Sequence, residues 1–88
     1  MIRKEITIYN KLGLHARPAA KIVKIAAQHK ASLWIEKDGE RVNGKSIMGV
    51  MMLAAEKGSK ILLEANGEEE EELIRELEEL IQNKFDED

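Results

Sequence analysis

Cysteine is absent from this chain of 88 residues, and proline and aromatic residues are scarce. Without cysteine there is no disulfide framework and no thiolate metal site, and such residue usage suits a reducing cytoplasm. No apolar run approaches the roughly 20 residues that a membrane-spanning helix needs, and the first residues lack a signal-peptide pattern. We therefore expect a cytoplasmic protein that does not enter a membrane. Its 43% hydrophobic residues predict one core and one small domain over residues 1–88.

Positive charge is concentrated in the first third of the chain, although the formal net charge is −3. The net negative charge argues against direct nucleic-acid binding. The basic first third predicts a surface that steers a phosphate group or an acidic protein, although an ordinary solvated face explains each lysine equally well. The basic side chains are those of Arg3, Lys4, Lys11, Arg17, Lys21, Lys24 and Lys30.

Hydrophobic periodicity predicts an alternating order of strands and helices. A period of two indicates strands, and apolar spacings of three and four indicate helices. Asp38-Gly39 between two strands is typical of a tight hairpin turn. The order β-α-β-β-α-β-α predicts an α+β fold, a two-layer open-faced sandwich in which three helices cover one face of a four-stranded antiparallel sheet. We expect strands at residues 2–9, 32–37, 40–43 and 60–65, helices at 16–28, 45–53 and 68–81, a turn at Asn66-Gly67, and fraying at 86–88.

The stretch from Gly13 to Ala20 holds the only proline and one of the two histidines. Proline is favoured in the first turn of a helix, where its missing N–H would be unpaired anyway. His15 and Arg17 then lie at a helix start, beside unpaired backbone N–H groups and the positive end of the helix dipole, which suits an anion. A neutral imidazole there can attack a phosphoryl group, which Arg17 and the N–H groups beyond Pro18 would stabilise. A capping histidine and a weakly paired surface arginine are the alternatives.

A second motif, Lys45–Met51, places Ser46 before a short apolar segment. Serine is a preferred N-cap, and this position predicts one. A helix this short cannot bury all of its large apolar side chains, and exposed methionine suits protein-binding surfaces. The side chains concerned are those of Ile47, Met48, Met51 and Met52.

Together, the motifs Gly13–Ala19 and Lys45–Met51 resemble the active-site and serine-phosphorylation signatures of the HPr family. These are histidine-containing phosphocarriers of the bacterial phosphoenolpyruvate-dependent sugar phosphotransferase system, and the resemblance covers essentially the whole chain. It implies that His15 accepts a phosphoryl group on Nδ1 from phospho-Enzyme I and passes it to sugar-specific IIA components. It also implies that Arg17 stabilises the phosphate and that Pro18 fixes the helix start.

The resemblance further implies that Ser46 is a target of an ATP-dependent HPr kinase/phosphorylase. A phosphate there adds roughly −1.5 to −2 charges at a helix start. That charge would repel Enzyme I and create a site for the transcriptional regulator catabolite control protein A. Three residues depart from the family pattern, and these differences bear on partner specificity: Leu12, Met52 and Ala54. The partner contacts that the resemblance implies are Ala16, Ala20, Ile47, Met48 and Met51.

Two other functions stay open, a regulatory module modified only at Ser46 and a carrier of a nitrogen-related phosphorelay. The presence of His15 favours the carrier, because the related catabolite-repression paralogue lacks that histidine, and the Ser46 region favours the sugar branch. We predict no cofactor and no metal site, since His29 has no evident second ligand and suits the C-terminal end of a helix. No glycine-rich nucleotide-binding loop is present. We therefore expect a monomeric carrier that is a substrate of other enzymes.

Overall fold

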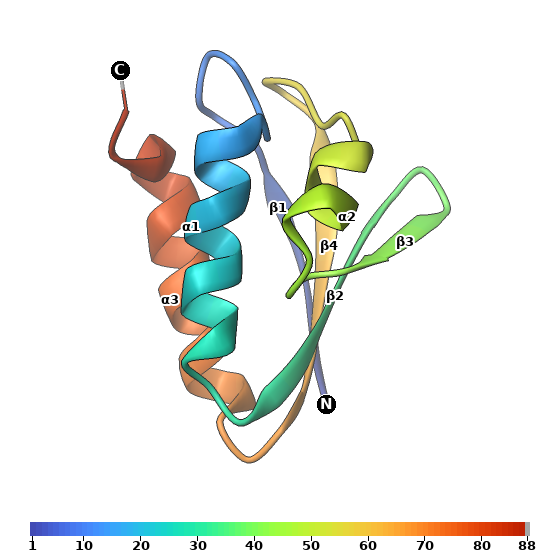
Figure 1. Ribbon diagram of the computed structural model, residues 1–88, viewed down its shortest axis with the longest axis vertical. Coiled ribbons are helices and arrows are strands. Elements are labelled where there is room, and N and C mark those ends of the chain that lie inside the picture. Colours follow the sequence, from blue (N-terminus) through green and yellow to red (C-terminus); the bar gives the residue numbers. More distant parts are fainter. Residues whose placement is uncertain (88) are drawn as a thin grey trace.

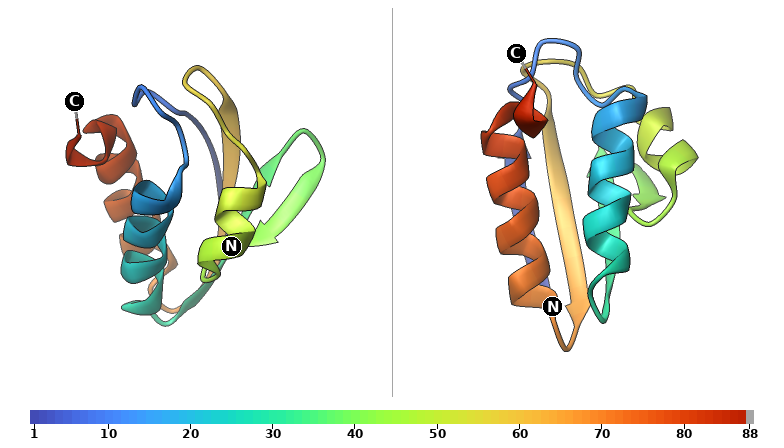
Figure 2. Two further views of the ribbon diagram at one scale, coloured as in Figure 1. Left: turned by 45° about the horizontal axis from the view of Figure 1, so that its top comes forward. Right: turned by 60° about the vertical axis from the view of Figure 1, so that its left-hand side comes forward.

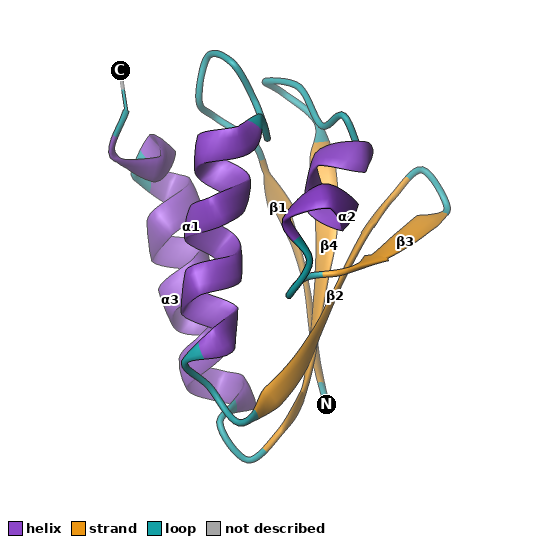
Figure 3. Ribbon diagram, viewed as in Figure 1, coloured by secondary structure: helices purple, strands orange, loops and turns teal. Residues whose placement is uncertain are grey.

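The computed structural model describes residues 1–87 and confirms the predicted α+β architecture. All four strands pair antiparallel in one sheet with the order β1-β4-β2-β3. The three helices lie on one side of this sheet (Figure 1; Figure 3). The strands are β1 (Ile2–Thr7), β2 (Ala31–Lys37), β3 (Glu40–Asn43) and β4 (Lys60–Gly67), and the helices are α1 (Ala16–Ala27), α2 (Ile47–Met52) and α3 (Glu70–Gln82).

The sheet and the helices form two layers (Figure 2), and the core lies between them, where alternate strand residues are buried. Ile6 and Ile8 are buried, as the period of two predicts, and so are Ala31, Leu33 and Ile35 of β2 and Ile61, Leu63 and Ala65 of β4. Each fully buried aliphatic side chain contributes roughly 1.5–3 kcal/mol relative to its exposed form. The opposite face of the sheet carries polar groups. There the Arg41 guanidinium lies 4.8 Å from the centroid of the Trp34 ring and 2.8 Å from Glu64, so Trp34 lies on this outer face of the sheet.

Both long helices bury the predicted apolar stripe. In α1 the buried face includes Ala19, Ile22 and Ala26, and in α3 it includes Leu73 and Leu77. The tight turn at residues 38–39 also forms, since both residues have positive φ. Within residues 1–87, no helix has the length and apolar character needed to cross a membrane.

The turn predicted at Asn66-Gly67 is wrong, because both residues belong to β4. Gly67 has a φ of 147°, and a Cβ at this position would lie 2.6 Å from the carbonyl oxygen of Lys30. The chain reverses only after this point. The glycine therefore permits a close approach of β4 to the start of β2 rather than a tight turn.

The fraying predicted at residues 86–88 is also wrong for the two residues that the structure describes. The chain after α3 folds into a 3-10 turn, η1 (Lys84–Asp86), and Phe85 within it is fully buried. All three residues of η1 have positive φ, between 55° and 59°. This segment turns back over the start of α1, and Asp88 lies outside the described residues.

Candidate functional site

His15 is the N-cap residue of α1, at the position that the sequence predicts. Its backbone is extended, with φ −81° and ψ −171°, and its side chain makes no capping hydrogen bond. The preceding loop is fixed by Gly13, with φ +69°, and by Leu14, whose N–H donates to the Ala55 carbonyl at 2.9 Å. Because the His15 side chain is 35% exposed, a partner protein can reach its ring.

Free backbone donors lie at the start of α1, but before Pro18 rather than beyond it. The Ala19 N–H donates to the His15 carbonyl at 3.0 Å, so the first N–H after Pro18 is already used inside the helix. The prediction that donors beyond Pro18 stay free is therefore wrong. Among residues 1–87, the Ala16 and Arg17 N–H groups form no hydrogen bond, and both precede the first intrahelical bond. These two donors and the helix dipole favour an anion beside His15.

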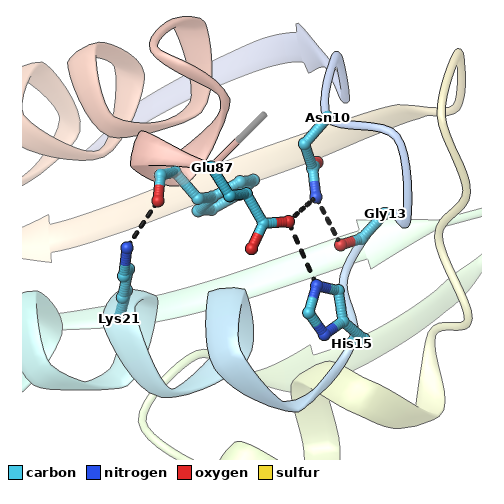
Figure 4. A network of polar contacts seen from close by, with 6 residues as sticks. Asn10, Gly13, His15, Lys21 and Glu87 are labelled. Carbon is cyan, nitrogen blue, oxygen red and sulfur yellow. Dashed lines mark hydrogen bonds and ion pairs between the residues drawn. The ribbon is translucent and has the colours of Figure 1, made fainter.

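The His15 ring is held by Glu87 from the far end of the chain (Figure 4). Its Nε2 lies 3.1 Å from Glu87 Oε1, and Asn10 Nδ2 donates to the same oxygen at 2.9 Å. The hydrogen bond from His15, followed by that from Asn10, holds the pKa of Glu87 below its ordinary value despite partial burial. An ionised carboxylate only accepts, so Nε2 donates in this hydrogen bond, and in the neutral form of the ring Nδ1 then carries the lone pair.

A shallow hollow of about 270 Å³ lies beside the ring and is lined by Lys11, Leu12, His15, Arg17 and Glu87. Arg17 is exposed and forms no ion pair within the described part of the chain, so its guanidinium is available to a ligand. The sequence places Lys11 among the basic residues of the first third but does not predict it as a site residue. The loop between β1 and α1 brings it to this hollow. A larger hollow of about 380 Å³ lies beside α3, but three acidic side chains line it and oppose a phosphate.

Ser46 caps α2, as predicted, because its Oγ accepts a hydrogen bond from the Gly49 N–H at 3.0 Å. α2 lies alongside α1, and its C-terminal end leads toward the end of the molecule where α1 begins (Figure 1). The apolar side chains of α2 form an exposed surface, here called the α2 surface. Its members are Ile47, Met48, Met51 and Met52, exposed by 43, 74, 40 and 67%.

The remaining predicted partner contacts are open to solvent as well. Ala16 and Ala20 are exposed on α1, whereas Pro18 between them is buried. Leu12 is 70% exposed beside the His15 ring, and Ala54 lines a second hollow with it. Two of the residues that depart from the HPr pattern therefore lie next to His15.

His29 lies after α1 and is only 9% exposed. Its Nδ1 is 3.0 Å from Glu69 and its Nε2 is 2.7 Å from Glu76, two partners that the sequence did not reveal. Burial lowers the pKa of His29, but the hydrogen bonds and charges of both carboxylates raise it by more. Glu72 also comes within reach of this group. Because both ring nitrogens are engaged by carboxylates, the cluster is an ion-pair network that joins α1 to α3.

Comparison with known proteins gives consistent results. The family model described as "PTS HPr component phosphorylation site" matches residues 2–83. Phosphocarrier protein HPr of Neisseria meningitidis serogroup A is 52% identical over 87 residues, 99% of this chain and 98% of the relative. The structure of HPr from Thermoanaerobacter tengcongensis superimposes with a TM-score of 0.95 at 48% identity, and covers 100% of this chain and 99% of that one.

A further structural relative is Crh, the catabolite-repression HPr of Bacillus subtilis. Its structure is 40% identical, with a TM-score of 0.76, and the alignment covers 96% of this chain and 97% of Crh. The matches extend over nearly all of each protein, and the sequence and structural comparisons agree. The chain therefore belongs to the HPr family, the phosphocarrier component of the phosphotransferase system.

Proposed function

We propose that the protein accepts a phosphoryl group on Nδ1 of His15 from phospho-Enzyme I and passes it to sugar-specific IIA components. The observation that carries this proposal is the hydrogen bond between His15 Nε2 and Glu87, which leaves Nδ1 as the nucleophilic nitrogen. The Nδ1 lone pair forms a bond to phosphorus while the bond from phosphorus to the donor atom breaks. Transfer onward reverses this exchange at the IIA component, and the protein ends unchanged, as a carrier rather than an enzyme.

Three groups near the ring are suited to hold the transferred phosphate. The N–H groups of Ala16 and Arg17 are free donors at a helix start, and the Arg17 guanidinium lines the same hollow. Charge-assisted hydrogen bonds from such groups are about twice as strong as neutral ones. All of them are open to solvent, so they stabilise the phosphate without enclosing it, which suits a group that must leave again.

Regulation through Ser46 forms the second part of the proposal. The Oγ of Ser46 already lies at the first turn of α2, where a phosphate from HPr kinase/phosphorylase would meet backbone donors. The new charge would stand beside the exposed α2 surface and weaken docking of Enzyme I there. The same charged surface would suit catabolite control protein A. We infer that the protein works in this way as a cytoplasmic monomer.

A second candidate function is a regulatory module that acts only through phosphorylation of Ser46. Its support is the likeness to Crh, a catabolite-repression protein with the same fold. Against it stands His15, whose orientation by Glu87 serves no purpose in a module of that kind.

The decisive experiment incubates the protein with phosphoenolpyruvate and Enzyme I and follows its intact mass. We expect one added phosphate that is lost in acid, that is absent in His15→Ala, and that persists in His29→Gln, a control substitution of the other histidine. A wild-type protein that gains no phosphate, beside an Enzyme I that phosphorylates a known HPr, would refute the carrier function and favour the regulatory module.

Two further variants test the supporting groups in the same assay. Arg17→Ala is expected to slow transfer by about tenfold, because a charged hydrogen bond contributes roughly 1.5–3 kcal/mol before solvent screening. Arg75→Ala, which removes an exposed arginine on α3, is its control. Ser46→Asp is expected to slow transfer from Enzyme I while Ser46→Ala does not. Equal rates for the two Ser46 variants would contradict the electrostatic account.

A further inference from the structure

The segment after α3 is anchored by a residue within its turn. Phe85 is fully buried in the core, and its carbonyl accepts a hydrogen bond from Lys21 Nζ on α1 (Figure 4). Phe85 and its two neighbours in η1 are all left-handed, and together they turn the backbone. As a result, the Glu87 side chain lies over the start of α1 with only 16% of its surface exposed.

The Glu87 carboxylate is held in place by Asn10 as well as by His15. Asn10 is fully buried, and its Nδ2 donates both to the Gly13 carbonyl at 2.8 Å and to Glu87 Oε1 at 2.9 Å. Asn10 therefore ties the carboxylate to the loop that carries His15. Figure 4 shows the second ring nitrogen of His15 on the side of the ring away from Glu87.

We propose that Glu87 is a positioning residue for phosphoryl transfer: its carboxylate orients the His15 ring through Nε2 and offsets the positive charge that the ring acquires when Nδ1 is phosphorylated. This inference rests on the proposed carrier function. It goes beyond it by assigning a role to a residue outside both sequence motifs. The Glu87 carboxylate meets the ring at Nε2, and Glu87 lines the same hollow as Lys11 and Arg17, whose positive charges suit the phosphate.

The charge balance of the step explains why a carboxylate is useful at this place. The form of the ring that can attack is the neutral one, with a proton on Nε2 and a lone pair on Nδ1. When Nδ1 bonds to phosphorus and the donor leaves with its electron pair, the ring keeps the Nε2 proton and becomes an imidazolium. A carboxylate at 3.1 Å stabilises that cation without removing its proton. When the phosphoryl group moves on, the electrons of the N–P bond return to Nδ1 and the ring is neutral again.

The first test is spectroscopic and needs no phosphate. Nitrogen-15 chemical shifts of the unphosphorylated protein, recorded at about pH 8.5 where imidazole is neutral, report which ring nitrogen carries the proton. We expect one Nε2–H tautomer of His15 in the wild type and a mixture of both tautomers in Glu87→Ala. A mixture in the wild type, or identical shifts in the two proteins, would overturn the orienting role. Amide spectra of the variant show whether the rest of the fold is retained.

The second test measures transfer from phospho-Enzyme I with a matched pair of variants. Glu87→Gln removes one negative charge and keeps the size of the side chain, and Asp86→Asn does the same at the neighbouring residue, which does not touch His15. We expect kcat/KM to fall about three- to tenfold in Glu87→Gln, because the lost charge was only partly screened, and to change less than twofold in Asp86→Asn.

The outcomes separate this inference from the function on which it rests. If the wild type accepts phosphate and Glu87→Gln is as fast, the role of Glu87 is refuted while the carrier function stands. Equal losses in Glu87→Gln and Asp86→Asn would also refute it, since they would point to the net charge of the segment. A wild type that accepts no phosphate would refute both.

Discussion

Replacing Ala54 with glycine is expected to make the protein more stable. Ala54 follows the C-cap residue of α2, and its φ of 50° is left-handed. Its N–H donates to the Met51 carbonyl at 3.0 Å, so this conformation closes the last turn of the helix. Glycine is the residue that helix ends favour in this position, because it has no Cβ to clash with the carbonyl oxygen. This chain therefore has an alanine at a position where the backbone conformation favours glycine.

The size of the effect follows from two opposing contributions. A left-handed conformation costs an L-residue roughly 1–2 kcal/mol relative to glycine. Glycine also has more conformational freedom than alanine in the unfolded chain, and this lowers the free energy of unfolding by about 0.4–1 kcal/mol. The Ala54 side chain is exposed, so loss of its methyl group removes little buried surface. The net gain is about 0.5–1 kcal/mol in the free energy of unfolding, or a rise in Tm of roughly 2–8 °C for a domain of this size.

Urea unfolding followed by circular dichroism measures this difference, with calorimetry for Tm. The matched control is Ala20→Gly, an exposed alanine within α1, where the backbone is helical. There the same change should lower the free energy of unfolding by about 1 kcal/mol. The two substitutions are chemically identical and should therefore have opposite signs. An Ala54→Gly protein that is no more stable than the wild type, beside a destabilised Ala20→Gly, would show that the left-handed residue carries no strain.

Two further predictions concern the ends of the first long helix. His29→Gln should reduce stability more at about pH 5.5 than at about pH 8.5 in urea unfolding. Burial lowers the pKa of His29, but Glu69 and Glu76 raise it on balance, so its stabilisation is complete below the unfolded pKa and is lost as pH rises through the folded one. A difference that does not change with pH would contradict this ion-pair network. Gly13→Ala should cost at least about 2–3 kcal/mol in thermal unfolding, because a Cβ would lie 2.2 Å from the Ala55 oxygen at a positive φ; a tolerated alanine would contradict the close approach.

The sequence was sufficient for those parts of the fold that depend on local pattern. Alternating residues such as Leu33 and Ile35 in β2 show a period of two, and burial of one sheet face follows from that period. The cap at Ser46 and the helix start at His15 are also local, since each depends on residues within one helical turn. Here backbone hydrogen-bonding requirements leave few alternatives, which is why these predictions are confirmed.

The sequence was not sufficient for the segment after α3. Phe85 is one aromatic residue among charged ones, too short a pattern for any period, and its burial depends on a left-handed turn that only the packed fold supports. The contacts of Glu87 with His15 and Asn10 span 72 and 77 residues of sequence. Contacts between residues so far apart leave no local pattern in the sequence. A glutamate at the end of a charged run looks the same in the sequence whether its carboxylate faces solvent or binds another residue.

The groups at the site that local sequence predicts differ in chemical role from the one that comes from a distant part of the chain. The motif around His15 contains the proposed nucleophile, the free backbone donors and the arginine, all within one turn of α1. The ring orientation comes from Glu87, which reaches the site only because Phe85 is anchored in the core. A chain with the same motif but a different segment after α3 would therefore keep the groups that bind phosphate and lose the one that fixes the Nε2–H tautomer. In this protein, the rate of transfer is expected to depend on residues that the family motif does not contain.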